Sequence, residues 1–362
     1  MKALSCFVAV LAGLLTGCTA QDDAPSTDEG EVRIDTTGDT ERAQYDAAVD
    51  FVTNYQPRCT KPRADGVKRV LISGYGRFMS NRNNATGRIV SALAGLAYPE
   101  TNPPAAGAVD PLAPQLAVRT QTVRWPESGA VEICALILPV VWDVAPIVLL
   151  RELAAFKPDL VLMNGIADVH QDLWIELGGV NEAAPYQDGT NLLVPYTRDG
   201  ESIPLLDGAP ATHPNSMSWD IVSRAANAAI ERATADHPEL ADILYGAVLA
   251  GFPRSGNTYL CNNITFTTSY LMDSPGTRAR LLEASTPIEG RTNFVDVRLP
   301  GDFRAIPRTF LHWPSALEDG DGPAIGARIV AALADAQLSA IEPPSPGNND
   351  LADPSLRGGS TF

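Results

Sequence analysis

Short apolar runs, several of them ending in glycine, alternate along this chain with segments of helical character. The apolar runs predict buried strands over residues 68–74, 131–140, 159–165, 245–251 and 308–314. Predicted helices lie beside or between them, over residues 41–55, 85–96, 143–156, 218–235, 264–272 and 324–341. This alternation predicts an α/β fold, a three-layer α/β/α sandwich around a mixed, mostly parallel sheet. In such a sheet we expect functional residues at the carboxyl ends of the strands.

Composition limits the classes of partner. The chain has 362 residues, of which 45% are hydrophobic, so it can bury a sizeable core. Its formal net charge is −16. That charge argues against nucleic acid, and against anionic membrane surfaces, as electrostatic partners. A soluble exported domain is enough to explain the acidity.

The N-terminus predicts an export signal over residues 1–17, with a positive start and an apolar core at residues 4–15 that is too short to span a bilayer. The sequence Leu-Thr-Gly-Cys at residues 15–18 resembles a bacterial lipobox, whose cysteine carries lipid. We therefore predict lipidation of Cys18 and a lipid-anchored protein in the cell envelope. Thr19 after the cysteine favours the outer membrane, facing the periplasm or the surface.

Three further regions follow the signal. Residues 18–42 are rich in Asp, Glu, Thr and Gly, and predict a flexible acidic linker behind the lipidated cysteine. Residues 43–341 hold the predicted strands and helices of one α/β domain. Residues 342–362 predict a disordered tail.

The five cysteines separate by position. Cys6 lies in the predicted signal, so Cys59, Cys134 and Cys261 remain, with Cys18, in an oxidising compartment. A disulfide between Cys59 and Cys134 would leave Cys261 as a free thiol, but the sequence leaves this pairing open. Cys-x-x-Cys and His-x-x-x-His spacings are absent from the sequence, which argues against a zinc site. We expect no metal and no cofactor.

Cys261 has the most informative surroundings. It follows the predicted strand 245–251, after breaks at Gly251, Pro253 and Gly256, and it precedes the predicted helix 264–272. A cysteine at a helix N-terminus is favoured as the thiolate, the form that acts as a nucleophile. The alternative is a small buried hydrophobic residue without a chemical role.

Three segments resemble the pyroglutamyl peptidase I family, and they occur in the family's order. The sequence Tyr-Leu-Cys-Asn at 259–262 matches the family's motif, and Glu-x-x-Gly-x-Asn at 176–181 is similar to the family's Glu-x-x-Ala-x-Asn. Phe-Leu-His-Trp-Pro at 310–314 stands for the family's Phe-Ile-His-Val-Pro. The resemblance covers residues 67–338, with insertions, and identifies 43–341 as a pyroglutamyl-peptidase-like domain.

This resemblance implies a function and a catalytic triad. Family members are cysteine peptidases that remove N-terminal pyroglutamate from peptides. It implies that Cys261 is the nucleophile, His312 the base and Glu176 the group that orients the imidazole. It also implies a peptide with a blocked N-terminus as substrate, and it is compatible with an oligomer.

The resemblance extends to a substrate pocket. Gly-Tyr-Gly-Arg-Phe at 74–78 is similar to the family's Gly-Phe-x-Pro-Phe, in which two aromatic rings pack on the pyroglutamyl ring. Tyr75 and Phe78 are therefore the predicted pocket walls, with Tyr259 and Leu260 as further substrate-binding residues. Ordinary core aromatics are the alternative. For the oxyanion we expect the amide of Cys261, together with an amide near residues 74–76.

Several departures from the family leave the activity open. Arg77 replaces a proline, Met79-Ser80 replaces Gly-Gly, and the family's Arg-Ile-Pro-Asp is reduced to Pro-Tyr-Gln-Asp at 185–188. An inserted segment at 273–304 has its own turns and could cover the site. The alternatives are a catalytically degenerate lipoprotein that binds a ligand, or an enzyme for another N-terminal acyl or lactam amide.

Overall fold

A mixed sheet forms the middle layer of the computed structural model, which describes residues 33–78, 81–167, 171–185, 193–196, 202–254 and 258–357. Several sequence predictions fall outside the described residues: the signal 1–17, the lipidated Cys18, Met79-Ser80 and residues 186–188. Across the sheet the strands follow the order β10 (Gly246–Ala250), β6 (Asp172–Glu176), β14 (Arg308–Pro314), β5 (Leu160–Ala167), β2 (Lys68–Tyr75), β4 (Gly129–Leu138) and β3 (Ala117–Trp125). Two short strands, β9 (Ser216–Met217) and β15 (Ser345–Pro346), extend it beside β14.

Strand directions confirm the predicted mixed, mostly parallel sheet. Strands β14, β5, β2 and β4 run parallel to one another, and β3 is antiparallel to β4. Strands β10 and β6 are parallel to each other but antiparallel to β14. The carboxyl ends of β6 and β14 therefore do not meet at a common edge of the sheet.

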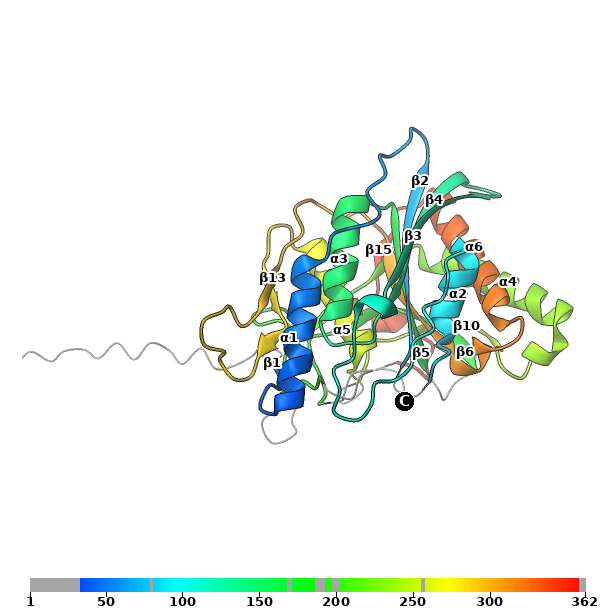
Figure 1. Ribbon diagram of the computed structural model, residues 1–362. Coiled ribbons are helices and arrows are strands. Elements are labelled where there is room, and N and C mark those ends of the chain that lie inside the picture. Colours follow the sequence, from blue (N-terminus) through cyan, green and yellow to red (C-terminus); the bar gives the residue numbers. More distant parts are fainter. Residues whose placement is uncertain are drawn as a thin grey trace, which may run out of the picture.

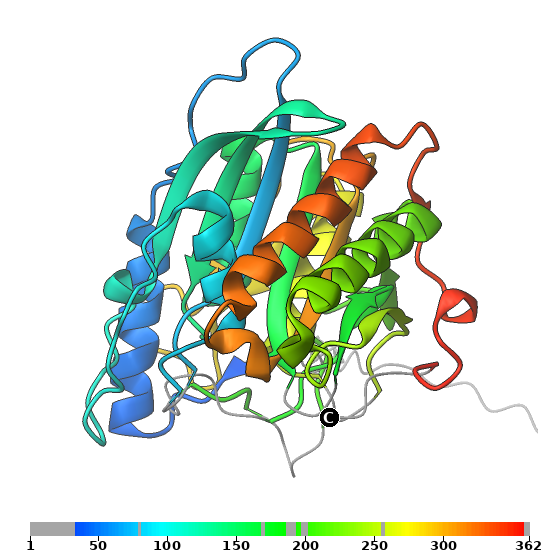
Figure 2. The same cartoon turned by 90° about the vertical axis from the view of Figure 1, so that its right-hand side faces the viewer.

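Helices cover both faces of the sheet, which confirms the predicted three layers. One face packs against α2 (Ala85–Ala94), α4 (Trp219–Asp236) and α6 (Gly322–Ser339). The other face packs against α1 (Asp39–Asn54), α3 (Val144–Phe156) and α5 (Leu260–Asp273). Figure 1 looks along the sheet between these two layers, and Figure 2 shows α4 and α6 in front of it. Each face has its own apolar core.

The ends of several elements follow from local chemistry. Strand β14 has the predicted bounds, and α2 begins after Asn84, whose Oδ1 accepts a hydrogen bond from the Thr86 amide at 3.1 Å. Sequence reasoning missed β3. Its residues, apart from the buried Trp125, are partly buried or exposed at the edge of the sheet, and they lack the apolar run that marks the central strands.

Small sheets and single turns complete the described chain. Strand β7 (Gly178–Val180) pairs with β8 (Thr212–Pro214), and β1 (Arg33–Ile34) pairs with β12 (Glu283–Ala284). Strand β11 (Ala279–Leu281) pairs with β13 (Val295–Val297), so the inserted segment 273–304 forms β11 to β13 beside α1 (Figure 1). Short 3₁₀ turns lie at η1 (Ala113–Gln115), η2 (Pro238–Leu240), η3 (Ser315–Glu318) and η4 (Asn349–Leu351).

Both predicted unstructured ends need correction where they are described. In the predicted linker 18–42, β1 already pairs with β12 and α1 begins at Asp39. In the predicted tail 342–362, the Asn349 side chain accepts a hydrogen bond from the Phe252 amide at 2.9 Å. The Leu356 carbonyl accepts one from Gly251 at 3.3 Å. The tail is ordered because it covers the open edge of β10, an edge that would otherwise expose unpaired backbone groups.

None of the helices in the described ranges combines the length and the apolar character needed to cross a bilayer.

Candidate active site

A cavity of about 200 Å³ opens beside the first turn of α5. Its lining consists of Tyr75, Phe78, Asn84, Val140, Ile166, Ala167, Glu176, Pro253, Tyr259, Leu260, Cys261, Asn262 and His312. Every residue predicted to act in catalysis or substrate binding is among them. The described part of the inserted segment 273–304 contributes no lining residue, so it does not cover this cavity.

Cys261 reaches the cavity from the start of α5. It is the second residue of that helix, as the glycine and proline breaks before it predict. Gly165, on the neighbouring strand β5, leaves room for the thiol, because a Cβ atom there would lie 2.7 Å from the Cys261 sulfur. The first turn of a helix has amides without intrahelical partners, and Cys261 belongs to this turn.

His312 and Glu176 meet across two antiparallel strands. In the register of β14 and β6, Glu176 lies opposite Phe310, so its side chain is the diagonal neighbour of His312 on one face. The His312 Nδ1 to Glu176 Oε1 distance is 2.6 Å, and both side chains are buried. We expected Glu176 at an edge shared with His312. Instead β6 runs against β14, and the contact comes from cross-strand pairing.

The backbone of Glu176 is held independently of its side chain. The hydroxyl of Thr309 donates a hydrogen bond to the Glu176 backbone carbonyl at 2.7 Å, and the side-chain amide of Asn215 donates one to the same oxygen at 2.9 Å. These two contacts fix the end of β6, so the carboxylate is presented to His312 from a rigid position.

Electrostatics favour a charged imidazole at this position. Burial alone would lower the pKa of His312, but the Glu176 carboxylate and the Cys261 side chain outweigh it and raise that pKa from 6.5 to about 10. The Cys261 contribution includes a hydrogen bond, and since Nδ1 faces Glu176, Nε2 is the ring nitrogen left for the thiol. At neutral pH this raised pKa favours the protonated ring, which lies between the Glu176 carboxylate and the Cys261 sulfur.

Aromatic rings form another part of the cavity wall. Tyr259 contacts Phe78 and Trp142 edge to face, with ring centroids 6.0 Å and 5.7 Å apart. Tyr75 is buried, and its hydroxyl donates a long hydrogen bond of 3.5 Å to the Leu260 carbonyl. Burial, followed by the neighbouring Cys261, raises the pKa of Tyr75 well above 10, so it remains a neutral phenol.

Asparagine side chains tie the loops around the cavity together. Asn262 accepts from the Val180 amide and donates to the carbonyls of Val180 and Glu182, each at 2.9 Å. Asn181 in turn donates to the Leu206 carbonyl at 2.8 Å. The segment after Glu176 is therefore bonded directly to the helix that carries Cys261.

The expected second oxyanion donor near residues 74–76 is already used. The Gly76 amide donates to the Leu138 carbonyl at 2.8 Å, and the Tyr75 amide donates to the Thr86 hydroxyl at 3.1 Å. Arg77 is buried in an ion pair with Asp110 and does not line the cavity. The first-turn amides of α5 are the remaining candidates.

Sequence reasoning missed part of the lining. Val140, Ile166, Ala167 and Pro253 were not predicted to line the site, although each lies at or just beyond the carboxyl end of β4, β5 or β10. The rule that sites gather at strand ends would have found them. Trp142, which supports Tyr259, follows β4 in the same way.

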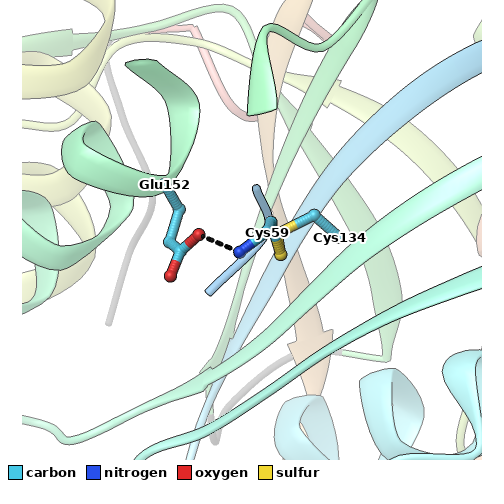
Figure 3. A group of neighbouring side chains, drawn as sticks. All are labelled: Cys59, Cys134 and Glu152. Atoms are coloured by element: carbon cyan, nitrogen blue, oxygen red, sulfur yellow. Dashed lines mark hydrogen bonds between the residues drawn. A yellow bond between two sulfur atoms is a disulfide. The ribbon is translucent and has the colours of Figure 1, made fainter. Parts of the chain in front are cut away.

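Cys59 and Cys134 form a disulfide, with their Cα atoms 5.9 Å apart (Figure 3), which settles the open pairing. Glu152 lies beside it and accepts hydrogen bonds from the Cys59 and Arg58 amides at 2.9 Å and 2.8 Å. Within the described residues this is the only group of three potential metal ligands, and its two sulfurs are bonded to each other. Cys261 is the free thiol of the described chain.

We found no family model and no curated protein that matches this chain. Among solved structures it is similar to pyroglutamyl peptidase I from Bacillus amyloliquefaciens, with 16% identity, 76% of this chain and 100% of that chain covered, and a TM-score of 0.45. It is also similar to pyrrolidone carboxyl peptidase from the hyperthermophile Pyrococcus furiosus, with 18% identity, 74% and 99% coverage, and a TM-score of 0.44. At these values the likeness concerns the fold, and we draw no functional argument from it.

Proposed function

We propose that this protein is a cysteine-type hydrolase that cleaves an amide bond with a Cys261–His312–Glu176 triad. The observation that carries the proposal is the meeting of a thiol, an imidazole and a carboxylate at the wall of one cavity. These groups have the roles of nucleophile, base and orienting acid in amide hydrolysis.

The proposed reaction needs no group beyond the chain and water. His312 holds the proton of the Cys261 thiol on Nε2, so the sulfur attacks the carbonyl carbon as the thiolate, and the resulting oxyanion is stabilised by amides in the first turn of α5. The carbon–nitrogen bond then breaks, His312 gives its proton to the leaving amine, and a thioester remains. Water attacks the thioester while His312 takes its proton, which releases the acid and restores the thiol. Throughout the reaction the proton stays on His312 Nδ1, which donates a hydrogen bond to the Glu176 carboxylate.

We propose an N-terminal pyroglutamyl group as the substrate. The cavity is small and its walls are mainly apolar, with Tyr75, Phe78, Tyr259 and Leu260 around the thiol. A small uncharged ring suits such walls, whereas a protonated N-terminal amine would lose its water against mainly apolar side chains. The three sequence segments that resemble the pyroglutamyl peptidases support the same substrate.

Two substrates that differ mainly in this charge test the proposal. We expect the full chain to release aminomethylcoumarin from pyroglutamyl-aminomethylcoumarin and not from prolyl-aminomethylcoumarin, whose ring carries a protonated amine. Cys261→Ala is the control for turnover by other enzymes in the preparation. If the protein turns over neither pyroglutamyl nor other acyl amides while Cys261 remains free to react, the binding-module alternative replaces the hydrolase.

We also propose that Cys18 carries a lipid that anchors the protein in the cell envelope, at the outer membrane. The lipobox-like residues 15–18 support this proposal. Cys18→Ser should move the expressed protein from the detergent phase to the aqueous phase. An unchanged partition would contradict the proposed anchor.

A further inference from the structure

One of the other buried carboxylates, Asp143, lies behind the pocket wall and outside the triad. Asp143 stands between β4 and α3, directly after Trp142, and its side chain has almost no exposure to solvent. Its φ of +60° is in the left-handed region, which few residues other than glycine adopt. The described residues place no ion pair on this carboxylate.

The two oxygens of Asp143 bind two different parts of the molecule. Oδ1 accepts a hydrogen bond from the Asn263 side-chain amide at 2.8 Å, and Oδ2 accepts one from the Leu282 backbone amide at 2.7 Å. Asn263 belongs to the first turn of α5, and Leu282 belongs to the inserted segment 273–304. One side chain therefore joins the helix of the thiol to the insertion.

On the pocket side, Asp143 supports the wall at two points. The Asn263 backbone amide donates to the Tyr259 carbonyl at 3.0 Å, and Asn263 lies two residues after Cys261. Trp142, which precedes Asp143, packs its ring against the ring of Tyr259. A shift of Asp143 would thus move Tyr259 both through α5 and through Trp142.

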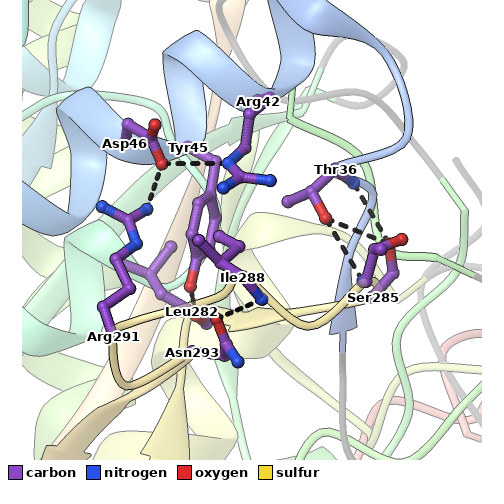
Figure 4. Close-up of polar contacts among 10 residues, drawn as sticks. Thr36, Arg42, Tyr45, Asp46, Leu282, Ser285, Ile288, Arg291 and Asn293 are labelled. Carbon is purple, nitrogen blue, oxygen red and sulfur yellow. Dashed lines mark hydrogen bonds and ion pairs between the residues drawn. The ribbon is translucent and has the colours of Figure 1, made fainter.

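On the insertion side, the contact is anchored to α1. Leu282 is fully buried, has a φ of +51°, and accepts a hydrogen bond on its carbonyl from the Tyr45 hydroxyl at 2.9 Å. Figure 4 shows Tyr45 reaching Leu282, and Arg291 of the same insertion paired with Asp46 of α1. The inserted segment is therefore a fixed support rather than a loose loop.

This arrangement has an energetic cost. Burial raises the pKa of Asp143 from 3.8 to about 6, although the hydrogen bonds from Leu282 and Asn263 oppose that rise. At neutral pH the fold therefore holds an ionised carboxylate in a desolvated place, on a backbone of unfavourable φ. Costs of this kind are concentrated where strain serves a functional site.

We propose that Asp143 is a positioning residue, which holds the Tyr259 wall and the Cys261 turn of α5 against the inserted segment 273–304. The expected effect on KM rests on the proposed function, whereas the expected effect on the reactivity of the Cys261 thiol does not.

Two substitutions of Asp143 distinguish a positioning role of its side chain from a contribution to fold stability alone. Asp143→Gly accepts the positive φ but removes both contacts, so we expect KM for the pyroglutamyl substrate to rise about tenfold, with a smaller fall in kcat. We also expect the rate of Cys261 alkylation by iodoacetamide, followed by peptide mapping of the full chain, to change by about threefold or more. Asp143→Asn keeps the shape, and its oxygen can still accept from Leu282 while Asn263 turns its amide, so KM and alkylation should stay near wild type.

Asp335→Ala is the matched control. Asp335 is also buried and accepts two backbone hydrogen bonds, from Glu127 at 3.0 Å and Ser128 at 2.8 Å, but it lies on α6 across the sheet. The Asp335→Ala variant should have a lower melting temperature but an unchanged KM and an unchanged rate of Cys261 alkylation. If Asp143→Gly behaves like this control, the proposal is overturned. If the wild type shows no turnover at all, the proposed function fails, and the alkylation rates alone decide for or against Asp143.

Discussion

Two histidine–carboxylate pairs lie at opposite ends of the same two elements, α5 and β14. At one end His312 bonds to Glu176 at 2.6 Å beside Cys261, which starts α5. At the other end the His213 Nε2 lies 2.9 Å from an oxygen of Asp273, which ends α5. The same kind of contact therefore occurs twice, once near each end of α5.

The surroundings of the two pairs differ. Both side chains of the first pair are 3% exposed, whereas those of His213 and Asp273 are 13% and 27% exposed. Asp273 also pairs with Arg308, a permanent cation at the start of β14, and His213 packs edge to face against Phe266 and Tyr270. We therefore propose that the first pair, whose imidazole lies beside the Cys261 thiol and the cavity, acts in catalysis, and that the second pair supports the fold.

The largest difference should appear when each histidine is removed. His312→Ala and Cys261→Ala should each lower turnover of the pyroglutamyl substrate by about 10⁴-fold or more, because the members of a triad act as a unit. His213→Ala should leave turnover near wild type and lower the free energy of unfolding by about 1 kcal/mol, since Asp273 keeps Arg308. Steady-state kinetics and urea unfolding measure both. Similar losses of turnover in the two histidine variants would remove the distinction between the pairs.

Substitution of the two carboxylates should have smaller effects than removal of His312, and these effects should differ in kind: Glu176 should affect catalysis and Asp273 stability. Glu176→Gln should lower kcat by about 100-fold or more, because the amide cannot balance the imidazolium charge, and should leave the fold intact. Asp273→Asn should leave kcat near wild type but destabilise the fold by about 2–4 kcal/mol, since the buried Arg308 loses its charged partner. A fall in kcat for Asp273→Asn at temperatures well below unfolding would contradict this pattern.

Features of the fold and the site that depend on residues close together in the chain could be predicted from the sequence. The bounds of β14 and the place of Cys261 at the start of α5 follow from apolar runs and from glycine and proline breaks nearby in the chain. The motif residues are also local, and the structure gathers them at one cavity.

Features that depend on residues far apart were not predictable. The reversed direction of β6, which lets Glu176 reach His312 as a diagonal neighbour, depends on the pairing order of the whole sheet. The Cys59–Cys134 pairing depends on a Cα distance that the sequence does not contain. Asp143 gains its role only because Leu282, far along the chain, packs against it. His213 stands before Pro214 with no motif around it, so its pairing with Asp273 carried no sequence signal.

Each of the two histidines has a glycine opposite it in its sheet. Gly165 pairs with His312, and a Cβ there would lie 2.7 Å from the Cys261 sulfur and 2.6 Å from the Phe310 ring. Gly179 pairs with His213, and a Cβ there would lie 3.0 Å from the Phe266 backbone nitrogen.

Alanine at these two positions should therefore act differently. Gly165→Ala should displace the thiol and lower kcat by about 10- to 100-fold, because side chains can give way while the attack geometry is lost. Gly179→Ala should destabilise the fold by about 1–3 kcal/mol with kcat retained, because the helix backbone cannot move as easily. Kinetics and thermal unfolding of both variants would distinguish the two outcomes, and a normal kcat in a folded Gly165→Ala protein would show that the thiol has room to spare.

The smallest expected effect is a pH dependence of stability that only the first pair should control. The folded-state pKa of His312 lies near 10, above the value of about 6.5 expected in the unfolded chain. The protonated ring therefore contributes its full stability below about pH 6.5, and this contribution is lost as the pH rises toward 10. In Glu176→Gln the main cause of the raised pKa is gone, so the fall in melting temperature between pH 7 and pH 9 should be smaller than in the wild type by about a few degrees. Asp273→Asn leaves the neighbours of His312 in place, so its lower melting temperature should fall over this range as the wild type does. A flattened pH dependence in Asp273→Asn, with a normal one in Glu176→Gln, would contradict the assignment of this pH dependence to His312.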